Sequence, residues 1–298
     1  MPRPFRIPVT KNYPLSERRR VCERLGELID ELVLGTMPLA ERPGSGGRMI
    51  LGSWARAHTT YGAIIVLASE EEPDGQTVVM LSRPLFETMV DLYWIARNPL
   101  EAQDLATQNY RLLRIVIPEH YNRSLKPGDR ALPVDPADLA DRETLAKTFG
   151  AKGQKHWTTL DLRARAKAVN EDVPQDSLGE LDARFDEDHH LANLVLHGSP
   201  MTINDRLLGT AGRLTVQLGA TDQHLPNGMR HAYWSYYRIG HLLVEQFAPD
   251  HLDHLRASYR EGWPTLQTIT TDAIKAAGRN GSCPCGSKRK TKDCHGRL

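Results

Sequence analysis

Several features that would identify a function class directly are scarce in this sequence. It holds 4 cysteines in 298 residues, and its 38 Lys and Arg side chains nearly balance 37 Asp and Glu side chains, for a net charge of +1. A chain so close to neutral has no whole-molecule attraction to nucleic acid. Apolar runs such as "GAIIVLA" fall far short of the ~20 residues needed to span a bilayer. The composition therefore predicts a soluble globular protein with a substantial core.

Three of the four cysteines gather in the basic stretch "GSCPCGSKRKTKDCHG", residues 281–296. A disulfide between Cys283 and Cys285 would close a very small, strained ring, because a relaxed bridge holds its Cα atoms about 5.5 Å apart. The N-terminal "MPRPFRIPVTKNYP" has no apolar segment and no small-residue cleavage site, so we expect no signal peptide. Both observations favour the reducing cytosol, and hence a role for these thiols other than disulfide formation.

Zinc explains the cysteine-rich tail better. Cys283, Cys285, Cys294 and His295 supply the donor number of a closed tetrahedral site, which leaves no open position and makes the metal structural. Three thiolates and a neutral imidazole carry a net negative charge on the metal site. That charge gives an electrostatic reason for the flanking cations, Lys288, Arg289, Lys290 and Lys292.

The same tail resembles a known motif. "GRNGSCPCGSKRKTKDCHG", residues 278–296, is similar to the SEC-C motif, named from the C-terminus of the preprotein translocase ATPase SecA and found at the ends of many bacterial proteins. The resemblance implies one zinc ion on Cys283, Cys285, Cys294 and His295. Because the motif of SecA contacts a chaperone and the ribosome, the resemblance also suggests that this tail docks on a protein, the ribosome or RNA.

Helical periodicity dominates the rest of the chain. The apolar positions predict helices over 16–34, 49–68, 76–97, 98–117, a short one from 136, one that opens at "SLGE" and reaches 196, one over 229–247, and one or two between 250 and 277. Glycine and proline predict loops over 35–47 and 118–136, and 202–220 could hold a short hairpin or an irregular excursion. We therefore expect an all-α multi-helix bundle, with an N-terminal helix and loop over 1–47, a helical domain over 48–277 and a zinc-binding appendix over 278–298.

Four polar residues on two expected helices form a tentative reactive group. Arg83 and Glu87 lie one helical turn apart and can pair. His190 and His197 lie on one face of a later helix, and imidazoles can transfer protons near neutral pH. Pro84 indicates either a helix start or a kink beside the Arg83–Glu87 pair. The group favours a structural network in the bundle core over a catalytic site.

The helical domain also resembles a family without an assigned reaction. "LSRPLFETMVDLYWIARNP" and the later "HGSP" are similar to an uncharacterised bacterial helical domain of unknown function, whose members sometimes carry SEC-C tails. The resemblance spans roughly 50–245 and implies no activity. It depends on Arg83, Glu87, Tyr93, His197 and Ser199.

Weaker signals lie elsewhere. The aromatic run over 233–237, beside several cations, could stack on single-stranded nucleic acid, although helix geometry predicts that at least half of it is core. "RARAK", residues 163–167, is expected to be a solvated basic face. Cys22 is expected to be a small apolar residue of a helix.

Two interpretations of function follow. In the first, the protein is a cytosolic helical binding or adaptor protein whose basic zinc tail docks a partner. In the second, it is a helical hydrolase or ribonuclease of a toxin or phage-defence type, in which Arg83, Glu87, His190 and His197 react. A solvent-open cleft that joins these four side chains would favour the enzyme, and a sealed network would favour the binding protein.

Overall fold

The structure is a computed structural model of the chain. It describes residues 13–36, 45–68, 71, 73–170, 172, 181, 185, 190–197, 207–210, 213–216, 224–266, 280–281 and 290. Within them, the helices are α1 (Leu15–Thr36), α2 (Ser45–Leu67), α3 (Gly75–Arg97), α4 (Pro99–Arg123), α5 (Pro136–Phe149), α6 (Leu162–Val169), α8 (His190–Leu196), α10 (Leu225–Phe247), the 3-10 turn η2 (Pro249–His251) and α11 (Leu252–Leu266). The all-α bundle expected from the sequence is confirmed.

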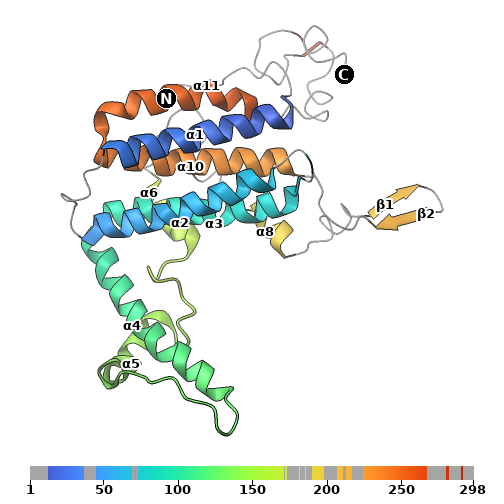
Figure 1. Ribbon diagram of the computed structural model, residues 1–298. Coiled ribbons are helices and arrows are strands. Elements are labelled where there is room, and N and C mark those ends of the chain that lie inside the picture. The colour runs from blue at the N-terminus through green and yellow to red at the C-terminus, as the bar shows by residue number, and fades with distance from the viewer. Residues whose placement is uncertain are drawn as a thin grey trace.

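The long helix α10 forms the centre of the bundle. Figure 1 shows it between α1 and α11 on one side and α2 and α3 on the other. Its side chains are buried on every face from Leu225 to Val244, as required of a helix with neighbours all round. Trp234, Tyr236 and Tyr237 are each 0 % exposed. The idea that these rings stack on nucleic acid is therefore wrong, because the neighbouring helices cover them.

Glycines let α10 approach its neighbours closely. A Cβ on Gly228 would lie 3.0 Å from the backbone nitrogen of Val79 on α3, and one on Gly240 would lie 2.4 Å from Cδ1 of Ile29 on α1. Real Cβ atoms do not make such contacts. The absence of a side chain at these positions thus allows the close packing of α10 on both sides.

Pro84 and Pro118 both lie inside helices, although we expected each proline to interrupt the helical pattern. Helix α3 runs through Pro84 from Gly75 to Arg97, which agrees with the helix expected over 76–97 and excludes the first of the two alternatives for Pro84, a helix start. Helix α4 runs through Pro118 to Arg123, six residues beyond the expected end at 117, and the following loop is correspondingly shorter. A proline inside a helix costs about 3 kcal/mol, which flanking helical turns and tertiary packing can offset.

The pair α4 and α5 forms an arm that projects from the bundle (Figure 1). Its own small core contains Leu112, Ile115, Leu145 and Phe149. Ion pairs join the two helices: Arg111 and Arg114 of α4 both contact Asp138 of α5. Asp135 caps α5 by accepting a hydrogen bond from the Ala137 amide at 2.9 Å, in agreement with the expected helix start near 136.

Of the two alternatives for 202–220, a short hairpin or an irregular segment, the structure contains the hairpin. Strands β1 (Leu207–Thr210) and β2 (Arg213–Val216) pair in antiparallel register, from Leu207 opposite Val216 to Thr210 opposite Arg213. Figure 1 shows the hairpin beside the bundle, on the side of α8. Among the described residues, no helix is both long and apolar enough to cross a membrane.

Candidate functional site

The expected pair on α3 is present. Nε of Arg83 donates to Oε1 of Glu87 at 2.7 Å across one helical turn. The two side chains are 27 % and 34 % exposed, so the pair lies at the edge of the bundle and is not sealed in its centre. Water therefore screens the attraction between the two charges.

The histidines of the tentative group lie on α8 or beside it. His197 follows the last residue of α8 and is exposed, and its backbone amide donates to the Asn193 carbonyl at 3.0 Å. The side chain of His190 lies outside the described residues, as do Cys283, Cys285, Cys294 and His295. The meeting of Arg83, Glu87, His190 and His197 in one site therefore stays a prediction.

A second charged group lies on α3, one turn after Glu87, and the sequence did not suggest it. The guanidinium of Arg165, on α6, pairs with the carboxylate of Asp91 and also lies 3.0 Å from Nε2 of His156. Arg165 is only 3 % exposed. The prediction that residues 163–167 form a solvated basic face is therefore wrong for Arg165, because α6 packs this side chain against α3. A negative residue one turn after Glu87 on the same face was the available signal.

His156 is held in its neutral form within this charged group. Nε2 of His156 lies 3.0 Å from the Arg165 guanidinium and 3.3 Å from the Asp91 carboxylate, while Nδ1 lies 2.9 Å from Oγ1 of Thr158 and accepts a hydrogen bond from the Thr158 amide at 3.3 Å. Burial lowers the pKa of His156, and the nearby Glu87 carboxylate only partly opposes that effect. The chain of contacts from Asp91 to His156 to Thr158 resembles the acid, base and hydroxyl nucleophile of a hydrolase. However, Thr158 is 1 % exposed and its hydroxyl also contacts the backbone of Leu160. Its hydroxyl is thus a structural part of the loop and is closed to a substrate.

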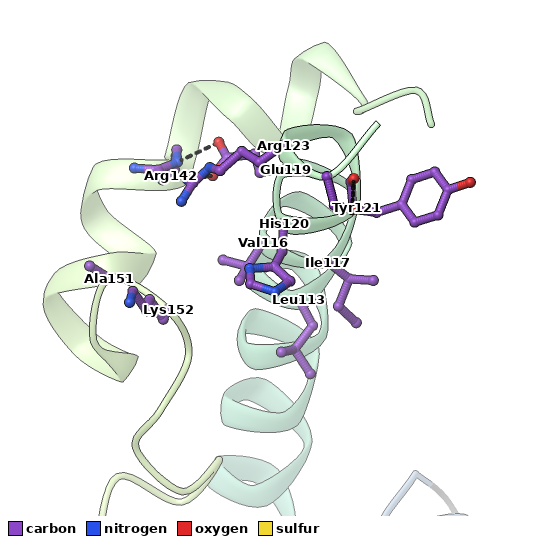
Figure 2. A pocket seen from close by; sticks show the side chains of 11 residues that line it. Leu113, Val116, Ile117, Glu119, His120, Tyr121, Arg123, Arg142, Ala151 and Lys152 are labelled. Carbon is purple, nitrogen blue, oxygen red and sulfur yellow. Dashed lines mark hydrogen bonds and ion pairs between the residues drawn. The ribbon is translucent and has the colours of Figure 1, made fainter. Parts of the chain in front are cut away.

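A surface hollow lies on the arm. We call it the arm groove: a cavity of about 830 Å³ between α4 and the loop that follows α5. Its α4 side carries Leu113, Val116, Ile117 and His120, spaced at three and four residues along one helical face. Figure 2 shows these side chains along α4, with Lys152 across the gap. Ile117 is 59 % exposed, whereas isoleucine is among the residue types that are most often buried in folded proteins.

Cations outnumber carboxylates around the arm groove. Arg123, Arg142 and Lys152 line it, whereas Glu119 is the one carboxylate among its described lining residues. Arg142 donates two hydrogen bonds to the Glu119 carboxylate, of 3.0 Å and 2.9 Å (Figure 2). These bonds lower the pKa of Glu119 and raise that of Arg142, so both groups are charged at neutral pH. The rim therefore carries a net positive charge.

The loop opposite α4 is fixed in place by glycine geometry. Gly150 and Gly153 have φ angles of +83° and +62°, which side chains rarely adopt. A Cβ on Gly153 would lie 3.3 Å from Cδ2 of Leu113, so the loop presses closely on α4. The close approach of this loop to α4 forms one edge of the arm groove, beside Ala151 and Lys152.

Comparisons with known proteins are sparse. One family model, described as a family of unknown function, matches residues 48–212, a span that includes the arm, the charged group on α3 and helix α8. No curated protein and no solved structure matches the chain.

Proposed function

The chain belongs to the DUF5677 family, whose function is unknown, and from the arm groove we propose that this member is a helical binding protein. The occupant of the groove is an amphipathic helix of a partner protein with acidic residues beside its apolar face. The observation that carries the proposal is the apolar groove with a cationic rim on a projecting arm.

The shape of the groove favours a helix. Leu113, Val116 and Ile117 all line the groove, and α5 and its loop form the wall across from Val116. In Figure 2 the Ile117 side chain points to the side of α4 away from that wall. A partner helix that placed its apolar face there would bury the exposed part of Ile117, which is worth about 1.5–3 kcal/mol for a fully buried side chain. Helices that bind grooves commonly do so through apolar anchors one turn apart.

The charge of the groove favours an acidic partner. Lys152 is exposed and forms no ion pair with any residue that the structure describes. Arg123 is 69 % exposed and lies 3.7 Å from Glu119, a distance that leaves most of its N–H groups open to a second carboxylate. Acidic groups on the partner would gain contacts here and would steer its approach.

A designed amphipathic peptide tests the proposal. We expect a peptide with leucines on one face and glutamates beside them to bind the full chain, and a matched peptide with lysines in place of the glutamates to bind at least about tenfold more weakly. Ile117→Asp should weaken binding of the acidic peptide by about tenfold or more, because the substitution places a charge among the apolar contacts. Leu100→Asp is the matched control, since Leu100 lies on the same helix, is 79 % exposed and does not line the groove. Fluorescence anisotropy measures all four affinities.

Three results would contradict the proposal. The acidic peptide could fail to bind, or bind Ile117→Asp as well as the natural chain, or bind no better than the lysine peptide. Self-association that Ile117→Asp abolishes would instead assign the groove to a second copy of this chain. Cleavage of RNA that is lost in His197→Ala, in a variant that stays folded, would favour the ribonuclease interpretation.

The tail extends the binding role. The donor set of Cys283, Cys285, Cys294 and His295 fits one structural zinc ion, as the resemblance to the SEC-C motif implies, and the adjoining cations fit a protein, ribosome or RNA surface. In this proposal the arm and the tail each hold a partner, in the reducing cytosol where the thiolates persist.

Metal analysis tests the tail. Protein purified without added metal should contain one zinc ion per chain, and the Cys283→Ser, Cys285→Ser double variant should lose it, because two donors cannot complete a tetrahedral site. Cys22→Ser is the control, since Cys22 is buried in α1, where burial raises its thiol pKa to about 12 and disfavours the thiolate. Full zinc content in the double variant would refute the ligand assignment.

A further inference from the structure

A second cavity lies where α4 leaves the bundle, separate from the arm groove apart from the shared Leu113. Its volume is about 400 Å³, within the range of small-molecule sites. Helices α2, α3 and α4 form its walls, and Trp157, from the loop before α6, closes one side. We call it the Asp91 pocket.

Asp91 supplies a fixed acceptor on the α3 wall of this pocket. Its carboxylate forms an ion pair with Arg165 and lies 3.3 Å from Nε2 of His156. Because Arg165 is itself 3 % exposed, the carboxylate cannot swing into solvent without leaving a buried cation behind. Each carboxylate oxygen can accept more than one hydrogen bond, so Asp91 keeps acceptor capacity for a ligand.

Arg56 supplies the opposite charge from α2. It is exposed, and its guanidinium forms no ion pair with any described side chain, Asp91 included. The pocket therefore presents the Asp91 carboxylate, which pairs with Arg165 and not with Arg56, and the separate guanidinium of Arg56. Such a separated pair is complementary to a ligand that carries both a cationic and an anionic group.

The remaining walls are apolar and aromatic. Trp157 is fixed edge-on against Trp94, with ring centroids 5.6 Å apart and planes at 82°. Tyr110 of α4 and Met49 of α2 also line the space. Gly52 of α2 also lines the space, and an added Cβ there would meet nothing within 4 Å, so a larger side chain could occupy part of the cavity at this position. These walls can hold a flat ring between the two charged ends.

We infer that the Asp91 pocket binds a small aromatic zwitterion of the amino-acid class. The ammonium group donates to Asp91, the carboxylate pairs with Arg56, and the ring lies against Trp157. This inference does not rest on the arm groove, so either site can fail its test without affecting the other.

Phenylalanine, phenethylamine and 3-phenylpropionate serve as probes, and ligand-observed NMR on the full chain measures their affinities. We expect phenylalanine to bind at least about tenfold more tightly than either single-charge analogue, because each analogue lacks one of the two ionic contacts. Gly52→Leu should weaken the binding of phenylalanine by about tenfold or more, because the added side chain takes up part of the cavity. Arg56→Gln should remove the preference for phenylalanine over phenethylamine.

Gly62→Leu is the matched control. Gly62 lies on the same helix, a Cβ there also meets nothing within 4 Å, and it does not line the pocket, so this variant should bind phenylalanine as the natural chain does. Three results would overturn the inference: no binding of phenylalanine at millimolar concentration, equal binding by Gly52→Leu and Gly62→Leu, or equal binding of phenylalanine and its single-charge analogues.

Discussion

Replacement of Asp91 by alanine should lower the free energy of unfolding by about 3–5 kcal/mol, the usual cost of leaving a buried charge without its partner. The stranded group is the guanidinium of Arg165, which is 3 % exposed and whose pKa burial already lowers to about 10. Its remaining side-chain hydrogen bonds, to Nε2 of His156 and the Asp161 carbonyl, are with neutral groups, and the attraction of the nearby Glu87 carboxylate offsets only part of the effect of burial. Urea denaturation followed by circular dichroism measures the loss.

Two further variants give this prediction its controls. Glu87 lies one turn before Asp91 on α3. We expect Glu87→Ala to lower the free energy of unfolding by about 1 kcal/mol or less, because the Glu87 and Arg83 side chains are about one third exposed. The double variant Asp91→Ala, Arg165→Met should recover most of the loss, since an apolar side chain can replace a buried pair at little cost. An Asp91→Ala protein as stable as the natural chain, or a double variant no better than the single one, would contradict the account.

Phe149→Ala should open the arm while the bundle stays folded. Phe149 is 0 % exposed and belongs to the arm core with Leu112, Ile115 and Leu145. Truncation of a buried phenylalanine costs about 3–5 kcal/mol, and a core this small has little else to offset the loss. The ion pairs between α4 and α5 do not compensate, because most of their side chains are exposed to solvent.

Hydrogen exchange resolves the two parts of the molecule. In the Phe149→Ala variant, protection of the α5 amides should fall by about a hundredfold or more, the equivalent of ~3 kcal/mol, while α10 keeps its protection. Leu139→Ala is the matched control on the same helix, since Leu139 is 44 % exposed and should change little. An equal loss of protection in α10 would show that arm and bundle unfold as one unit. The open arm should also lose affinity for the acidic peptide.

Local signals in the sequence determined most of the helices. Apolar periodicity placed α1, α3 and α10 within a few residues of their observed bounds, because a repeat near 3.6 residues leaves one face to be buried. Proline and aspartate placed the start of α5, since Asp135 can cap a helix and Pro136 needs no hydrogen-bond donor in its first turn. The Arg83–Glu87 pair also followed from spacing alone.

Only the tertiary structure decided which charges are buried and which apolar residues are exposed. The periodicity within 163–167 is the same whether Arg165 faces water or Asp91, and the packing of α6 on α3 decides the outcome. Likewise, nothing in the order of residues along α4 distinguishes Leu112, which packs against α5, from Ile117, which the arm leaves exposed. Both helical faces are apolar, and the number of neighbours that each face receives is a property of the whole fold. The helical period can be read from residues that are close together in the sequence, whereas the neighbours that a helix packs against come from residues that are distant along the chain.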